Sequence, residues 1–384
     1  MTAGRAAVLA IDGGNSKTDV ALVAADGSLL ASARGPGSNA HIIGLDQAMA
    51  VIGQLAALAA RQAGLAAGEP PPGDGAPVAD GAPVTGSAPV AGHASACLAG
   101  ADLAEDEERL SAAMRAQGWA LTCSVVNDTF AILRAGLVPG LAEAAGGPAR
   151  AADVDGAARR DVPIAAGRDG QVRHWGVAVT CGAGINCVAV APDGREARFP
   201  ALGPVTGDWG GGEGLGREAL WWAVRDEDGR GPPTMLREAV AAFFGMPTAS
   251  DVGIGIHYGK IPESELLGLA PVLLGTAARG DEVARKVVTR LADEIVAMAV
   301  AMIRRLGLTG QAVPVILGGG MLTARDPMLT DGIAAGLAAR APGAFLHIVD
   351  VPAVAGAALL GLDHVGAPVS AEERLRGAYL AQVT

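Results

Sequence analysis

Cysteine is scarce in this sequence. The 384 residues contain four cysteines, Cys97, Cys123, Cys181 and Cys187, and no two of them form a Cys-x-x-Cys pair. A disulfide framework or a structural zinc site normally depends on such paired cysteines, so neither is indicated. We expect all four to be buried thiols.

Positive charge and long apolar runs are also lacking. The 29 Lys and Arg residues are outnumbered by 40 Asp and Glu residues, and the formal net charge is −11. Nucleic acids and anionic membranes attract basic patches, so this charge argues against both as partners and favours a small-molecule substrate. The N-terminus carries no apolar signal region, and no run of about 18 apolar residues occurs. We expect a cytoplasmic protein.

A carboxylate, two glycines, two hydroxyls and a lysine stand between two apolar runs, residues 8–11 and 20–23. The runs predict strands, and the glycine pair allows positive φ in a tight turn between them. The N–H groups of such a turn suit nucleotide phosphates, and a carboxylate at the strand end suits Mg²⁺ held through water. Plain turn chemistry is the alternative. The candidate residues are Asp12, Gly13, Gly14, Asn15, Ser16, Lys17 and Thr18.

The same plan recurs in the second half of the chain. Apolar runs at 176–181 and 185–190 flank a second glycine turn, Gly182, Ala183 and Gly184. Two hairpins of one design, each opening one half of the chain, suggest two related lobes that close on a nucleotide from both sides. Ligands commonly bind in such a crevice between domains. Half of the residues are hydrophobic, which is ample for the cores of two domains and therefore for an enzyme.

Asn127 and Asp128 follow a predicted strand at 121–126 and precede a helical pattern that begins near Phe130. Open α/β sheets bind their ligands at the carboxyl ends of strands, so this is a candidate site for chemistry. The alternative is structural, because an aspartate at the start of a helix commonly serves as its N-cap.

Three other segments carry the same ambiguity between ligand binding and local structure. Asn39 follows a turn-rich loop and could satisfy its own backbone, and Asp208, in Gly-Asp-Trp-Gly-Gly-Gly, could be a turn residue. Gly318, Gly319 and Gly320 follow a predicted strand at 313–317. They could form a tight turn or let the chain lie flat against an adenine or ribose.

The features above divide the chain into lobes at 1–138 and 139–384. A Pro-, Gly- and Ala-rich insert at 66–92 is expected to be a mobile loop, and a second insert at 140–172 a surface excursion. The apolar segment 354–362 and the amphipathic tail, 371–384, complete the second lobe or cross back to the first. Apolar periodicity predicts helices over 45–58, 105–117 and 282–306.

Five motifs together resemble the ordered motifs of the N-acetylglucosamine kinase and BadF/BadG/BcrA/BcrD ATPase family, in the superfamily of actin, heat-shock chaperones and sugar kinases. The resemblance implies an α/β, two-lobed actin-like ATPase fold (ribonuclease H-like), with duplicated sheet-and-helix domains and the active site in the cleft. It implies ATP and Mg²⁺ as cofactors. The motifs are IDGGNSKT (11–18), VVNDTFAIL (125–133), TCGAGINC (180–187), GDWGGG (207–212) and VILGGG (315–320).

This resemblance implies transfer of the γ-phosphoryl of ATP to the 6-hydroxyl of N-acetylglucosamine, glucosamine or a related hexosamine. Asp128 then acts as general base, because a carboxylate must orient the accepting hydroxyl and take its proton. The residues expected to hold the sugar are Asn39, Asn127, Asn186 and Asp208. Two positions depart from the family pattern: Ile185 stands where serine is common, and Trp209 follows Asp208.

Three other functions remain open. An ATPase that activates a reductase or dehydratase needs cysteines at the lobe interface for an iron–sulfur cluster, and the cysteines here are dispersed. A sugar-responsive repressor needs a helix-turn-helix ahead of the first strand, where only seven residues precede Val8. A non-catalytic nucleotide- or sugar-binding module would keep the glycines without needing Asp128. Assembly as a homodimer is also open.

Overall fold

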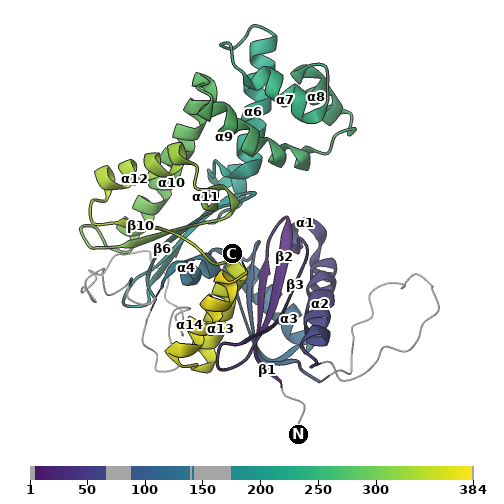
Figure 1. Cartoon of the computed structure of the whole chain (residues 1–384), viewed down its shortest axis with the longest axis vertical. Helices are drawn as coiled ribbons and strands as arrows, with labels where there is room; N and C mark the ends of the chain where they lie inside the picture. The colour runs from purple at the N-terminus through teal and green to yellow at the C-terminus, as the bar shows by residue number, and fades with distance from the viewer. Residues whose placement is uncertain (1–4, 66–87, 139–140, 142–173, 383–384) are drawn as a thin grey trace, which may run out of the picture.

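The computed structural model describes residues 5–65, 88–138, 141 and 174–382. They form two five-stranded sheets with helices packed on their faces, and the two units lie one above the other as two lobes (Figure 1). Nearly all of the predicted inserts at 66–92 and 140–172 lies outside the described residues.

The first sheet has the strand order β3-β2-β1-β4-β5. Its central strand β1 pairs antiparallel with β2 and parallel with β4. The apolar residues of β1 and β2 are buried on both faces, which is why these strands read as continuous apolar runs. The elements of this part of the chain are β1 (Ala6–Gly13), β2 (Lys17–Val23), β3 (Leu29–Pro36), α1 (Ala40–Ile43), α2 (Leu45–Gln62), β4 (Ala91–Leu98), α3 (Ala104–Gln117), β5 (Ala120–Asn127) and α4 (Thr129–Gly136).

The second sheet repeats this plan, with the order β10-β9-β6-β7-β8. Its central strand β6 pairs antiparallel with β7 and parallel with β9, as β1 does with β2 and β4. The prediction of two related α/β lobes, each opening with a hairpin, is therefore confirmed. The strands are β6 (Gly176–Cys181), β7 (Ile185–Val190), β8 (Glu196–Arg198), β9 (Pro314–Gly318) and β10 (Phe345–Ile348).

Helices cover the second sheet and extend beyond it as a helical top (Figure 1). The long helix predicted at 282–306 is α10, and its apolar stripe is buried against the sheet and α12. Within the described residues no single helix has the length and apolar character of a membrane span, and only the bent pair α7 and α8 passes that test jointly. The helices are α6 (Gly211–Glu227), α7 (Leu236–Phe244), α8 (Ala249–His257), α9 (Leu269–Ala278), α10 (Glu282–Arg305), α11 (Gly320–Thr323) and α12 (Pro327–Arg340), with 3₁₀ turns at Gly203–Thr206 and Glu263–Gly268.

The end of the chain crosses back to the first lobe. Helix α13 (Ala353–Val365) packs on β1, β2, β4 and α4, and α14 (Val369–Leu380) packs on α13. The crossing therefore starts well before the tail at 371–384. Apolar residues of α13 and α14 share one buried cluster with α4 and with the inner faces of both sheets. This cluster joins the two lobes below the cleft.

A buried group of charges fixes α4 at this junction. Arg134 of α4 pairs with Asp363 of α13 and Glu372 of α14, both at 2.7 Å. Burial opposes ionisation of Glu372, but its hydrogen bond with Arg134 outweighs this and lowers the pKa of Glu372 to about 2. The guanidinium of Arg376 donates to carbonyls of the last turn of α4, among them that of Ala135 at 2.6 Å. The helix that begins beside Asp128 thus has a rigid C-terminal support.

The thiols are distributed much as expected. Cys97, Cys181 and Cys187 are buried in the two sheets, whereas Cys123 is partly exposed. Burial raises the pKa of the Cys123 thiol to about 11 and that of Cys181 to about 12. Such thiols stay protonated at neutral pH.

Candidate active site

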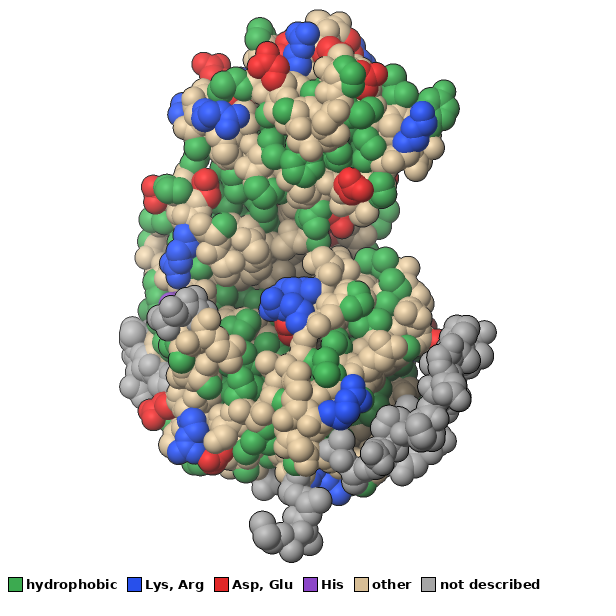
Figure 2. Space-filling view, turned by 45° about the vertical axis from the view of Figure 1, so that its right-hand side comes forward, with side chains coloured by type: hydrophobic (Ala, Val, Ile, Leu, Met, Phe, Trp, Pro, Cys, Tyr) green, Lys and Arg blue, Asp and Glu red, His purple; other side chains and the backbone are tan. Residues whose placement is uncertain are grey.

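A cavity of about 720 Å³ lies between the lobes, and most of the predicted site residues line it. In the space-filling view it opens as a hollow between the upper and lower halves of the molecule (Figure 2). The predicted residues that line the cavity are Asp12, Gly14, Asn15, Ser16, Lys17, Asn39, Asn127, Asp128, Gly182, Ala183, Gly184, Asn186, Gly319 and Gly320. Those absent from its lining are Gly13, Thr18, Asp208 and Gly318.

The first hairpin turns more simply than predicted. The N–H of Gly14 donates to the carbonyl of Lys17 at 2.9 Å, which leaves Asn15 and Ser16 at the tip. Neither Gly13 nor Gly14 has positive φ, so the prediction that the pair serves the turn in this way is wrong. Gly13 is needed for packing instead, because a Cβ there would lie 2.7 Å from a methyl of Leu98.

Asp12 lies at the end of β1, and its side chain is almost fully buried. Burial, and then the nearby charge of Asp128, raises the pKa of Asp12 to about 7, although Lys17 opposes the shift. The Lys17 ammonium reaches the cavity and pairs at 3.0 Å with Asp19, which Arg34 also holds. Among the described residues that line the cavity, Lys17 is the one cation, and it is already paired with Asp19.

Asp128 does not cap α4. It stands at the N-cap position, but its carboxylate accepts no capping hydrogen bond, whereas Asn127 Oδ1 accepts one from the N–H of Thr129 at 2.9 Å. The N-cap of α4, which was the structural alternative for Asp128, is therefore provided by Asn127. Burial raises the pKa of Asp128 to about 6, against the effect of the Thr129 hydroxyl, which donates to it at 3.5 Å.

Asp102 is a cavity residue that was not among those predicted from the sequence. It lines the cavity and accepts a hydrogen bond at 2.7 Å from the side-chain amide of Asn127. Burial, and then the charges of Asp128 and Asp106, raises the pKa of Asp102 to about 7. A signal was present, because Asp102 follows the end of β4 as Asp128 follows the end of the adjacent parallel strand β5. The carboxyl ends of parallel strands meet at one edge.

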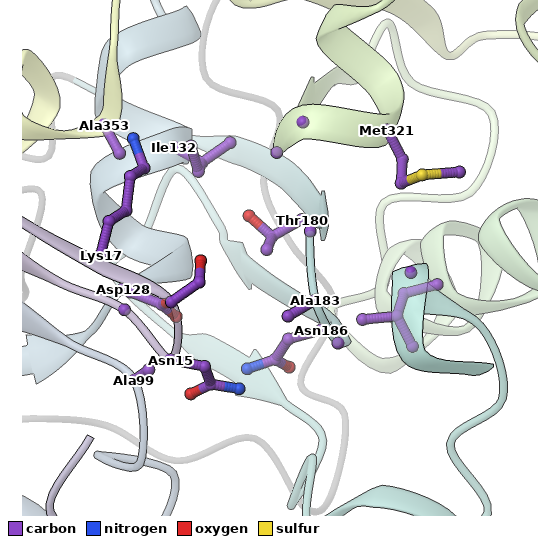
Figure 3. Close-up of a pocket in the computed structure, with 18 of the residues that line it drawn as sticks. Asn15, Lys17, Ala99, Asp128, Ile132, Thr180, Ala183, Asn186, Met321 and Ala353 are labelled. Carbon is purple, nitrogen blue, oxygen red and sulfur yellow. The ribbon is translucent and has the colours of Figure 1, made fainter. Parts of the chain in front are cut away.

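A hydrogen bond joins the two lobes at the base of the cavity. Asn186 of β7 donates from Nδ2 to Asn127 Oδ1 at 3.2 Å, and its own Oδ1 accepts from the N–H of Cys187 at 2.7 Å. Figure 3 shows Asn186 and Asn15 facing one another from the two hairpins. The side-chain amides of Asn127 and Asn186 are therefore both fixed in orientation beside Asp128.

The second hairpin is braced by the start of α6. The N–H of Gly212 donates to the carbonyl of Gly182 at 2.7 Å, and that of Glu213 to the carbonyl of Ala183 at 3.0 Å. Gly211 has φ of 71°, and a Cβ there would lie 2.5 Å from the Ala183 carbonyl oxygen. Gly211 thus permits close contact between two backbone segments.

Asp208 is occupied within its own loop. Its carboxylate accepts hydrogen bonds from the N–H of Gly203 at 2.9 Å and from the Thr206 hydroxyl at 2.7 Å, as a turn residue would. The adjacent Trp209 stacks on the guanidinium of Arg290 at 3.8 Å and does not line the cavity. The expected contact of Asp208 with a sugar stays a prediction.

Asn39 serves local structure and the cavity together. Its Oδ1 accepts the N–H of His41 at 2.8 Å and caps α1, as the alternative for this residue expected. Its Nδ2 donates to Asn15 Oδ1 at 2.8 Å, and the residue lines the cavity. The amide therefore holds the tip of the first hairpin in place.

The glycines that end β9 divide between packing and the cavity. A Cβ on Gly318 would lie 2.5 Å from Ile132 of α4, so this glycine permits close contact of the lobes. Gly319 has φ of 87° and lies against the backbone of Cys181. Gly320 lines the cavity, and a Cβ there would meet nothing within 4 Å. Apolar residues of the second lobe that also line the cavity are Leu267, Ala270, Pro271, Leu274, Met321 and Ala324.

Comparisons with known proteins agree with this architecture. The sequence profile of the BadF/BadG/BcrA/BcrD ATPase family matches residues 9–361. N-acetyl-D-glucosamine kinase of Dictyostelium discoideum is 23% identical over 363 residues, 92% of this chain and 97% of that protein. N-acetylmuramic acid/N-acetylglucosamine kinase of Clostridium acetobutylicum is 23% identical over 224 residues, 58% of this chain and 62% of that protein, so the chain matches less than two thirds of this relative.

Solved structures share the fold. A Chromobacterium violaceum protein proposed to be an N-acetylglucosamine kinase superposes with a TM-score of 0.64 at 22% identity, covering 93% of this chain and 99% of that one. A Porphyromonas gingivalis protein with the same proposed activity gives 0.61 at 17% identity, with coverages of 93% and 99%. The chain has the two-lobed actin-like ATPase fold that the five motifs implied.

Proposed function

Because the chain belongs to the BadF/BadG/BcrA/BcrD ATPase family, we propose that it is an ATP-dependent sugar kinase. Its acceptor is N-acetylglucosamine or a related hexosamine, in keeping with the activities for which the two curated relatives are named. The product is the sugar phosphate formed at the 6-hydroxyl, a primary hydroxyl that can approach a buried carboxylate with little crowding.

The observation that carries this proposal is the state of Asp128. Its carboxylate lines the cavity between the lobes, is free of the capping role, and has a pKa raised by burial to about 6. A general base is most effective when its pKa lies near the working pH. Asp128 orients the sugar hydroxyl and accepts its proton as the oxygen attacks the γ-phosphorus of ATP, and ADP leaves.

The first hairpin is proposed to hold the phosphates. Asn15 and Ser16 at its tip and the Lys17 ammonium face the cavity, and the Gly182–Gly184 turn approaches from the other lobe. The apolar lining of the cavity at Leu274 and Met321 offers the surface that a nucleotide base requires. Asn39, Asn127 and Asp102 of the first lobe then provide the hydrogen-bond partners that sugar hydroxyls need.

Mg²⁺ fits the residues present. Asp12 is buried beside Asp128 with its pKa raised to about 7, so the pair lacks compensating positive charge. Magnesium is usually held by one or two carboxylates, waters and the substrate phosphates, and Asp12 would be the protein's contribution, through water. When bound, the ion would neutralise charge that develops on the transferred phosphoryl group.

The test is ADP formation by purified protein with Mg²⁺·ATP and a panel of sugars. We expect turnover with N-acetylglucosamine, glucosamine or N-acetylmuramic acid and a background rate without sugar. The matched control is 6-deoxy-N-acetylglucosamine, which lacks the accepting oxygen. It should bind and inhibit without being consumed. Equal ADP formation with every sugar and with none would overturn the kinase assignment and leave an ATPase.

The activator ATPase is the competing function. It needs cysteine thiolates at the lobe interface, whereas Cys97 and Cys181 lie inside the sheets, where burial raises the pKa of each thiol. A protein purified without air that carries iron would favour the activator, and a colourless protein with sugar-dependent turnover would favour the kinase.

A further inference from the structure

Thr180 is the one hydroxyl residue of the second hairpin. Residues 176–190 read GVAVTCGAGINCVAV, so the turn itself offers only glycine, alanine and isoleucine. The first hairpin carries Ser16 and Thr18 in the equivalent stretch. Ile185 stands where sugar kinases of this family commonly have serine. The second hairpin therefore has a single side-chain hydroxyl with which to contact a ligand.

The register of β6 directs the Thr180 side chain toward the cleft. Ala178, two residues earlier, packs in the cluster that joins α4 to both sheets, and side chains two apart along a strand share a face. The cross-strand partner of Thr180 is Asn186, whose amide reaches Asn127 beside Asp128. Thr180 lines the cavity, and Figure 3 shows its side chain projecting from the strand into the space between the lobes.

The hydroxyl has no partner among the described residues. Thr180 Oγ1 is buried from solvent and makes no hydrogen bond with a described group. A buried polar atom without a partner destabilises the folded protein, and such atoms are rare enough to need an explanation. The hydroxyls of Thr18 and Thr276, also buried, both donate, to Ser38 at 2.8 Å and to the carbonyl of Val272 at 2.8 Å.

We propose that Thr180 is a nucleotide-binding residue whose hydroxyl donates to a phosphate oxygen of the bound nucleotide, in place of the serine hydroxyl absent at Ile185. A phosphate is favoured over a sugar because Thr180 pairs with Gly318 and precedes the Gly182–Gly184 turn, so backbone of the two glycine segments surrounds it. Most of the polar groups suited to a sugar, those of Asn39, Asp102 and Asn127, come from the other lobe. The inference rests on the proposed use of ATP.

The experiment compares Thr180→Val with Thr180→Ser and with the control Thr276→Val. Dissociation constants for ADP and for a non-hydrolysable ATP analogue are measured by calorimetry, and Tm is measured without ligand. A hydrogen bond to a charged group is strong, so Thr180→Val should weaken nucleotide binding about tenfold or more. Thr180→Ser should bind within about threefold of wild type, because it keeps the donor.

Stability provides the readout that a structural hydroxyl would not give. Removing an unpartnered buried hydroxyl should leave the Tm of ligand-free Thr180→Val unchanged or raised, whereas Thr276→Val should lower Tm and leave nucleotide affinity unchanged. Unchanged affinity in Thr180→Val would overturn the inference. If affinity were unchanged and Tm fell, the partner of the Thr180 hydroxyl would be a buried water rather than a nucleotide.

Failure of the inference and failure of the kinase assignment give different results. If wild-type protein binds ADP but consumes no ATP in response to sugar, the kinase assignment fails and the Thr180 comparison still decides the inference. If wild type and Thr180→Val bind ADP equally while sugar-dependent turnover is present, only the inference fails. Absence of nucleotide binding by wild type would overturn both.

Discussion

The two lobes have one topology but contribute different chemistry to the cavity. β1, β2 and β4 are connected and paired as β6, β7 and β9 are. Among the described residues that line the cavity, every charged side chain comes from the first lobe: Asp12, Lys17, Asp102 and Asp128. The second lobe adds glycine backbone, three amide or hydroxyl side chains (Thr180, Asn186 and Thr323) and an apolar wall.

This difference suggests a division of labour within a duplicated fold. Burial raises the pKa of all three carboxyls of the first lobe, and the charge of Asp128 raises the pKa of Asp12 and of Asp102 further. A cluster of buried carboxyls lowers the stability of the folded protein, but it suits a reaction that needs a general base and a cation site. The second lobe provides shape, which depends on close packing of glycine rather than on charge. Substitutions in each lobe should therefore fail in different ways.

The largest effect is expected from Asp128→Asn in the first lobe. Asparagine has the same shape but cannot take a proton, and loss of a general base costs about 10²–10⁴ in rate. We expect kcat to fall at least about a hundredfold while Tm and nucleotide affinity stay near those of wild type. Steady-state kinetics and thermal unfolding of the same preparation check this.

The control for Asp128 is its neighbour. Asn127→Ala removes the capping acceptor of α4 and the hydrogen bond from Asn186, so it should cost about 1 kcal/mol or more of stability. If Asp128→Asn lowered stability by a similar amount and left kcat near normal, Asp128 would be a structural residue. The proposal that the first lobe supplies the general base would then be wrong.

Substitutions in the second lobe should act by disturbing its packing, and Gly211→Ala tests this. The substitution forces a side chain onto a backbone with φ of 71° and against the Ala183 carbonyl oxygen. We expect a loss of about 3 kcal/mol in the free energy of unfolding and weaker nucleotide binding, because the hairpin must shift. The control is Gly214→Ala in the same helix, where a Cβ meets nothing within 4 Å. Denaturant titration should show no loss in Gly214→Ala.

The contrast between Gly211 and Asp128 shows how far sequence could lead. The hairpins, their flanking strands and the position of Asp128 follow from local apolar patterns and turn residues, which lie close together in the chain. The role of Gly211 depends on where α6 meets a turn some 27 residues earlier, and no local pattern encodes that contact. A glycine in the sequence indicates that the backbone can adopt unusual conformations, but it does not indicate which segment packs against it.

Long-range contacts also explain the other differences. Asp102 and Asp128 meet because β4 and β5 are adjacent, and Asp208 is turned into its own loop by Gly203 and Thr206. The return of α13 to the first sheet was an open alternative, since an apolar helix suits either lobe. The buried pairs of Arg134 with Asp363 and Glu372 fix the choice in the folded chain.

Lys17→Ala should have a smaller effect than the changes above and should fall on the nucleotide. Arg34 still holds Asp19, with Nη2 to Oδ2 at 3.1 Å, when Lys17 is removed, so we expect little change in stability. Loss of a cation near the phosphates should lower kcat/KM for ATP about tenfold. The control is Lys260→Ala, an exposed lysine in the second lobe, with wild-type kinetics expected. Unchanged ATP kinetics in Lys17→Ala would remove the first hairpin from the phosphate site.

The smallest expected effect concerns pH and the carboxyl pair of the first lobe. The folded-state pKa of Asp12 is raised from 3.8 to about 7. A raised carboxyl favours folding when protonated, so its contribution is present below the unfolded pKa and is lost as pH rises through about 7. Removing the charge should therefore help at high pH only. We expect ligand-free Asp12→Asn to be more stable than wild type at pH 8, with the difference vanishing toward pH 4.

Thermal unfolding across this pH range, with a chelator present, decides whether the pair behaves in this way. The control from the second lobe is Asp331→Asn, an exposed carboxyl on α12, which should follow wild type at every pH. Asp128→Asn should also reduce the pH dependence, because the charge of Asp128 contributes to the shift at Asp12. A difference between Asp12→Asn and wild type that is independent of pH would mean that the first lobe holds Asp12 ionised at no cost. Its carboxylates would then not require a cation.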